Sequence, residues 1–179
     1  MTSVRQSEHK GILRPLLVVL GSILLFAYGI IALLSQDPFW FLTRAEVPDP
    51  ERIVIRVDGV ETVLNAATPG YGQIVEATRE ALSGFKAWAP GSAGLSESTL
   101  QEYQQRGIIL ELYFSEPVDF HLPFNDGRPT ALLIPIEGRY AGEGYVFRGK
   151  HGRWWAGQLT MRDPQPLMDA LSALGYIRQ

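Results

Sequence analysis

The sequence predicts an α+β fold: a single transmembrane helix at the N-terminus, followed by one small domain with a mainly antiparallel sheet of about six strands and helices on one face. Three observations lead to this prediction. One apolar run is long enough to cross a bilayer, several short segments alternate apolar and polar residues, and turn-forming dipeptides lie between those segments. The elements after the first helix are expected in the order β-β-α-α-β-β-β-β-α.

Residues 16–36 are predicted to form the transmembrane helix, because residues 16–34 carry no charged side chain. At about 1.5 Å per residue this run spans roughly 28 Å, close to the hydrocarbon thickness of a bilayer. A signal peptide is the alternative interpretation, but its apolar region is usually about 7 to 15 residues long and ends in a small-x-small cleavage site. Residues 31–37 offer no good pair of small residues at that spacing.

The charges before the apolar run predict its direction across the cell membrane. Arg5, Lys10 and Arg14 outweigh Glu8, so the positive-inside tendency keeps residues 1–15 in the cytoplasm. The chain is therefore expected to be a single-pass protein with its C-terminal domain outside the cytoplasm. Its expected lipid contact is through residues 16–36.

Phe39, Trp40 and Phe41 directly follow the apolar run and are expected at the level of the headgroups, where amphipathic rings collect. The alternative is a short apolar loop that packs on the domain. Residues 37–51 are expected to be a juxtamembrane linker and residues 52–179 one domain with its own core. Gly21 and Gly29 are too far apart for a Gly-x-x-x-Gly pair, so helix dimerisation is unsupported.

Composition excludes several classes of function. The net charge of −3 argues against nucleic acid as a partner, because phosphates need clustered cations. The chain has no cysteine, which removes thiolate nucleophiles, disulfides, zinc-thiolate sites and an acylated cysteine anchor. No cofactor and no metal are expected.

Alternation of apolar residues predicts the first hairpin. Residues 53–57 form a strand that ends at Asp58-Gly59, a strong two-residue turn, and residues 60–64 return antiparallel to it. From Gln73 the apolar period becomes helical and ends before Pro90. Ser98 with Gln101 is typical of a capping box for a short helix that closes at Gly107.

The second half of the chain is predicted to hold four strands and a helix. Strands are expected over residues 108–115, 131–137, 145–148 and 153–161, the second of them at an edge or a bulge because it contains Pro135. Lys150-His151-Gly152 should join the last two as a hairpin. Asp163-Pro164 starts the final helix and Gly175 ends it.

Three groups of residues partly match known catalytic patterns. Asp119, His121 and Asp126 are the nearest approach to a metal or acid-base cluster, but the surrounding prolines and glycine predict a turn in which polar residues are expected anyway. Residues 90–94 resemble a serine elbow but lack its preceding strand. Glu137 and Glu143 could pair as in glycosidases but lie beside arginines, and the nearby glycines are expected in turns and bulges. No residue is predicted to be catalytic.

Trp154 and Trp155 are the most informative candidates, because neighbouring strand residues point to opposite faces of a sheet. Trp155 is expected under the helices, which leaves Trp154 on the open face, covered by a loop or presented to a partner. The residues predicted to bind a partner on this face are Trp154, Arg148, Arg162 and Tyr113, with Tyr145 as an alternative to Tyr113.

The expected function is a membrane-anchored binding, sensing or assembly module outside the cytoplasm, without catalytic activity, whose sheet face takes a protein, peptide or glycan. An anchored hydrolase of envelope material that uses Asp119, His121 and Asp126 is one alternative. An accessory subunit of a membrane complex, with partner interfaces at Trp154 and at Gly21 and Gly29, is the other.

Overall fold

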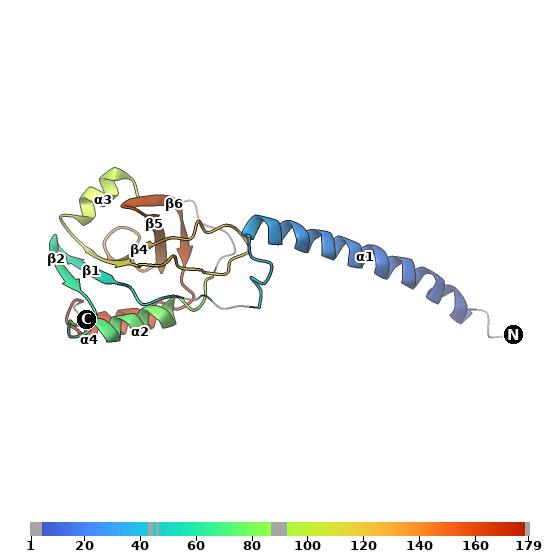
Figure 1. Cartoon of the computed structure of the whole chain (residues 1–179), viewed down its shortest axis with the longest axis horizontal. Helices are drawn as coiled ribbons and strands as arrows, with labels where there is room; N and C mark the ends of the chain where they lie inside the picture. Colours follow the sequence, from blue (N-terminus) through green and yellow to red (C-terminus); the bar gives the residue numbers. More distant parts are fainter. Residues whose placement is uncertain (1–4, 43–44, 46, 87–92, 178–179) are drawn as a thin grey trace.

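A long N-terminal helix extends away from a compact α+β domain in the computed structural model of the chain (Figure 1). The structure describes residues 5–42, 45, 47–86 and 93–177. Helix α1 runs from Arg5 to Ser35 and includes one candidate membrane span, Leu13–Ser35, whose 23 residues are long and apolar enough to cross a bilayer. None of this span is buried against the domain.

The domain is built on one six-stranded sheet in which every neighbouring pair is antiparallel, as the sequence predicts. The strand order is β2-β1-β3-β4-β5-β6, so β2 and β6 form the edges. The strands are β1 (Arg52–Val57), β2 (Val60–Leu64), β3 (Ile108–Tyr113), β4 (Ala131–Glu137), β5 (Tyr145–Lys150) and β6 (Arg153–Thr160).

Both predicted hairpins are present, and each turns through two residues with positive φ. Asp58 and Gly59 have φ of 48° and 82° between β1 and β2, and His151 and Gly152 have φ of 52° and 75° between β5 and β6. Positive φ at both central residues defines a type I′ turn, whose twist matches that of the flanking strands.

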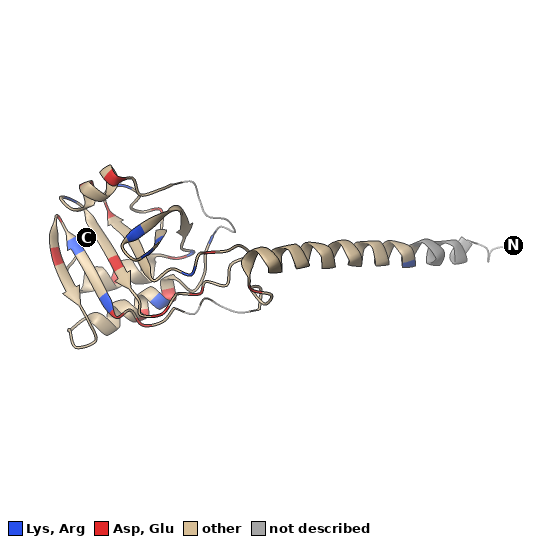
Figure 2. Cartoon of the chain, turned by 45° about the horizontal axis from the view of Figure 1, so that its top comes forward, with Lys and Arg blue, Asp and Glu red and all other residues tan. Residues whose placement is uncertain are grey.

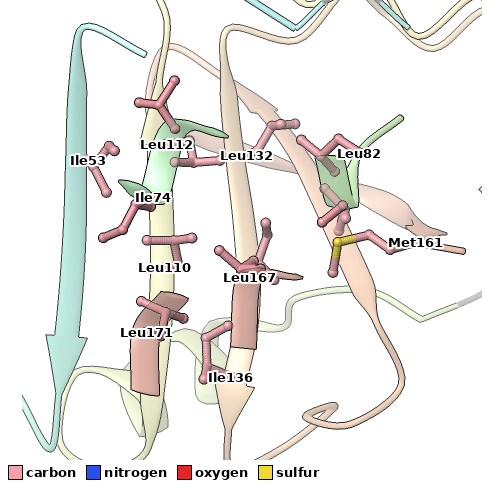
Figure 3. Close-up of a cluster of buried hydrophobic side chains, with 14 of the residues drawn as sticks. Ile53, Ile74, Leu82, Leu110, Leu112, Leu132, Ile136, Met161, Leu167 and Leu171 are labelled. Carbon is pink, nitrogen blue, oxygen red and sulfur yellow. The ribbon is translucent and has the colours of Figure 1, made fainter. Parts of the chain in front are cut away.

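Helices α2 (Tyr71–Ala81) and α4 (Gln165–Ala173) cover one face of the sheet (Figure 1). The apolar stripes of these helices meet the inward-facing residues of the strands in the larger hydrophobic core. Figure 3 labels ten of the buried residues: Ile53, Ile74, Leu82, Leu110, Leu112, Leu132, Ile136, Met161, Leu167 and Leu171.

Helix α3 (Glu97–Tyr103) lies on the opposite face, so the prediction that the helices share one face is wrong (Figure 1). Its Tyr103 is buried in a second core with three strand residues: Ile109, Leu133 and Phe147. These apolar residues alternate with those of the first core and therefore need a cover of their own.

Several predicted boundaries differ from the structure. Helix α2 ends at Ala81, because Phe85 pairs with Met161 in a short antiparallel bridge; Pro90 lies outside the described residues. The cap of α3 is Ser96, whose side chain accepts from the Thr99 amide, and not Ser98. Of the two settings predicted for Pro135, an edge or a bulge, the structure shows the second: strand β4 is internal, and the register with β3 shifts between Ile108 and Ile109, where Ile109 pairs with Pro135.

Candidate functional site

A joint between α1 and the domain brings together side chains that are far apart in the sequence. Helix α1 ends at Ser35, and Gln36 adopts a positive φ of 59° that reverses the chain. The Tyr28 hydroxyl then donates a hydrogen bond of 2.7 Å to the Pro38 carbonyl oxygen, which ties the reversed chain back to the helix. This turn presents Asp37 to the long β3–β4 connection.

Asp37 and His121 form the central contact of the joint. The His121 Nδ1 atom lies 2.7 Å from Asp37 Oδ2 and 3.6 Å from Asp119 Oδ1. The backbone amide of His121 also donates to Asp119 Oδ1 at 3.0 Å, and its φ is 48°. The other Asp37 oxygen accepts from the Phe39 amide at 2.8 Å. Because both partners are only partly exposed, this contact is better shielded than a surface ion pair.

The pKa of Asp37 reflects these contacts. Burial by itself would raise it, but the hydrogen bond from His121, the Phe39 amide and the charge of His121 together bring the pKa below the ordinary value of 3.8. The ionised carboxylate is therefore the stable form at the joint.

A pocket of about 170 Å³ opens beside this contact. Asp126, at its wall, is only 8% exposed and accepts from the amides of Phe120 at 3.3 Å and Arg128 at 2.8 Å. Burial raises the pKa of Asp126, and the two amide hydrogen bonds oppose that shift. The pocket is lined by Ser35, Gln36, Asp37, Asp119, His121, Leu122, Phe124, Asn125, Asp126 and Arg128.

The joint also holds the donor types that divalent cations accept. One ligand atom from each of Asp37, Asp119 and His121 lies within 4.8 Å of the other two. A cation between them would have to replace the hydrogen bond from His121 to Asp37, since the 2.7 Å separation leaves no room for an ion. The contact in this structure is a hydrogen bond between the His121 imidazole and the Asp37 carboxylate.

The structure brings together part of the cluster noted in the sequence. Asp119 and His121 are in contact, whereas Asp126 lines the same pocket but bonds to backbone amides. Asp37 was not identified from the sequence, because it precedes His121 by 84 residues and belongs to the predicted linker. No local pattern signals such a contact.

Trp154 belongs to the second core and not to an open face. Its ring lies directly over Gly149: a Cβ on Gly149 would come within 2.6 Å of the Trp154 ring. It is partly buried and packs against the cluster that contains Phe147. Trp155 is not part of the core under the helices, because its ring lies against Gly127 of the β3–β4 connection.

Arg148 lies on the opposite face from Trp154. It pairs across the sheet with Leu132 of the larger core, and it is 5% exposed. Its Nη1 donates to the Asp126 carbonyl oxygen at 2.9 Å, while its Nε atom has no hydrogen-bond partner in the described part of the chain. Burial lowers the pKa of Arg148.

The two remaining predicted binding residues lie apart from Trp154. Tyr113 lies on the same face as Trp154 but three strands away, on β3. Its hydroxyl donates to Glu111 Oε2 at 2.7 Å, and the Cζ atom of Arg52 lies 4.3 Å from the centroid of its ring. Arg162 is exposed beside Gly84, beyond the end of β6. The four residues therefore do not form one surface.

The other catalytic patterns contribute no site. Residues 90–92 of the serine-elbow-like segment lie outside the described residues. Glu137 and Glu143 are exposed at the turn between β4 and β5, and neither forms an ion pair within the described chain.

Comparison of the chain with protein-family models, with curated proteins and with solved structures gives no match.

Proposed function

We propose that this chain is a single-pass membrane protein that holds a binding or assembly module outside the cytoplasm. The observation that supports the anchor best is that no residue of the apolar window of α1 that the structure describes is buried, and most of its side chains are exposed, for example Leu24 at 62% and Leu25 at 72%. A helix that is apolar all round and exposed needs lipid around it.

The distribution of charge supports the same arrangement. Figure 2 shows charged residues gathered on the domain, whereas the described part of α1 beyond its N-terminal end has none. Arg14 and the basic residues before it favour a cytoplasmic N-terminus. The domain would then lie outside the cytoplasm, directly after the anchor.

The surface proposed for a partner is the part of the second face that α3 leaves open, over β1 and β3. Here the Arg52 guanidinium stacks on Tyr113, Tyr113 is hydrogen-bonded to Glu111, and Arg56 pairs with Glu61 of β2 at 2.9 Å. A surface of alternating charges around an amphipathic ring suits a polar protein or peptide partner.

Two measurements test the anchor and its direction. After alkaline carbonate extraction the full-length chain should stay in the membrane pellet, and external protease should degrade the domain when the cytoplasmic membrane is intact but its outer side is accessible. A mature chain that lacks residues 1–36 in the aqueous fraction would identify α1 as a cleaved signal sequence. Degradation only after the membrane is broken would reverse the orientation.

An anchored hydrolase is the second candidate, and the contact between Asp37 and His121 favours it. A carboxylate on Nδ1 holds an imidazole in the tautomer that leaves Nε2 as a base, and no described residue hydrogen-bonds to Nε2 of His121. No described hydroxyl is hydrogen-bonded to His121 either, so the nucleophile would be water. If hydrolysis of envelope polymers by the purified chain survives His121→Gln, this candidate is excluded.

A further inference from the structure

A short apolar turn follows α1 and exposes most of its side chains. In this segment, residues 39–42, which we call the aromatic turn, Phe39 is 58% exposed, Phe41 54% and Leu42 68%. Three large apolar side chains on one tight turn are unusual at a surface that faces water. The turn is closed by a hydrogen bond from the Leu42 amide to the Phe39 carbonyl oxygen at 2.8 Å.

The aromatic turn does not continue in the direction of the helix but folds back beside it. The Phe41 ring meets the Tyr28 ring edge to face, with 6.1 Å between centroids and 80° between planes. Tyr28 is also hydrogen-bonded to Pro38. Since Tyr28 lies about two helical turns before Ser35, the aromatic turn is level with the last part of the apolar span.

The one charged residue between Arg14 and the aromatic turn faces the domain. Asp37 is held by His121 and by the Phe39 amide. A carboxylate near the hydrocarbon is costly unless it is paired. The contact therefore turns the charge toward the pocket and leaves Phe39, Phe41 and Leu42 on the apolar side.

We infer that the aromatic turn inserts into the outer leaflet beside α1, at the boundary between acyl chains and headgroups. This inference rests on the proposed membrane anchor. Lipid is the occupant because the apolar surface of the turn is continuous with that of α1 through Tyr28 and Phe41. Trp and Tyr are enriched at this depth, because a ring with an apolar body and a polar tip suits the boundary between lipid and water.

The insertion would set the position of the domain. Asp37 precedes the aromatic turn by two residues, and it contacts His121 of the β3–β4 connection, whereas the side chains of Phe39, Phe41 and Leu42 are exposed. The domain is thus held against the membrane by α1, by the aromatic turn and by the joint. The pocket lined by Asp119 and Asp126 then lies at the level of the headgroups.

The absence of cysteine allows a direct test with the full chain, since a single introduced thiol is the only one present. Nitroxide labels are placed at Phe39→Cys, Phe41→Cys and Leu42→Cys, in vesicles of phosphatidylcholine and phosphatidylglycerol at 3:1. Collision with oxygen, which concentrates in lipid, is compared with collision with a water-soluble nickel chelate. Leu24→Cys, in the middle of α1, and Val60→Cys, exposed on β2, are the controls.

The three labels on the aromatic turn should give oxygen-to-nickel ratios several-fold above that of Val60→Cys and below that of Leu24→Cys. Ratios equal to that of Val60→Cys, with Leu24→Cys in lipid, would overturn the inference and leave the anchor intact. Labels that are immobilised and shielded from both reagents would place the turn against protein and also overturn it. A water-exposed Leu24→Cys label would refute the anchor itself, and the inference with it.

Discussion

At the scale of single residues, Asp37 has the clearest energetic signature. Its pKa is lower in the folded protein than the ordinary 3.8, so the folded state gains stability from the ionised carboxylate above that pH and loses it as the pH falls through the folded pKa. Because the pair is partly exposed, we expect Asp37→Asn to lower the free energy of unfolding by only about 0.5–1 kcal/mol near pH 6.

Urea unfolding of the full chain in detergent micelles checks this value. The difference between Asp37→Asn and the wild type should shrink as the pH is lowered below 3.8. The exposed Glu80→Gln substitution on α2 is the matched control, because Glu80 has no side-chain partner in the described chain. A difference that stays constant with pH would show that the carboxylate charge is not the cause.

Trp154 and Gly149 give a second residue-scale prediction. We expect Trp154→Ala to lower the free energy of unfolding by about 2 kcal/mol, since the ring packs against the second core. Gly149→Ala should also destabilise, because its Cβ would lie 2.6 Å from the Trp154 ring and 2.8 Å from the Arg153 carbonyl oxygen. The double variant should lose less stability than the sum of the two, and strict additivity in urea unfolding would contradict the contact.

At the scale of secondary-structure elements, the two type I′ hairpins offer a matched pair. Gly59 and Gly152 occupy the same turn position with φ of 82° and 75°. A Cβ on Gly152 meets nothing within 4 Å, so Gly152→Ala should cost only the left-handed backbone penalty of about 1–2 kcal/mol. A Cβ on Gly59 would lie 2.8 Å from the Gln104 carbonyl oxygen, so Gly59→Ala should cost more.

The order of these two variants in thermal or urea unfolding is the measurement. Equal losses would mean that the β1–β2 turn does not pack against the end of α3 as described. The hydrogen bonds of Asp58 argue for that packing: its amide donates to the Gly107 carbonyl oxygen at 2.9 Å, and its carboxylate accepts from the Gly107 amide at 3.0 Å.

At the scale of the whole molecule, α1 and the domain have separate sources of stability. Neither hydrophobic core contains any of the α1 side chains that the structure describes, and the joint rests on one partly exposed pair and the neighbouring turn. We therefore expect a chain of residues 45–179 to unfold in one cooperative urea transition, with near-UV circular dichroism retained. A broad, non-cooperative transition would show that the domain depends on its anchor.

Local patterns in the sequence determined the apolar helix, the strands in their order and both hairpins. Each of these depends on residues that are close together or contiguous in the sequence: an uncharged run, alternation with period two, and the Asp58-Gly59 and His151-Gly152 turns. Because these features depend on residues that are close in the sequence, the local pattern is sufficient to predict them.

Only the tertiary structure decided which residues of neighbouring strands lie on the same face of the sheet, and which side chains meet at the joint. Alternation relates side chains within one strand, but only the register between strands shows which residues of β5 and β6 share a face. Trp154 pairs with Gly149, and Arg148 pairs with Leu132, so Arg148 lies on the face opposite to that of Trp154. The same limit hid the cover that α3 gives to the second face. Asp37 meets His121 because the chain reverses at Gln36 and the β3–β4 connection reaches it, contacts that no local pattern encodes.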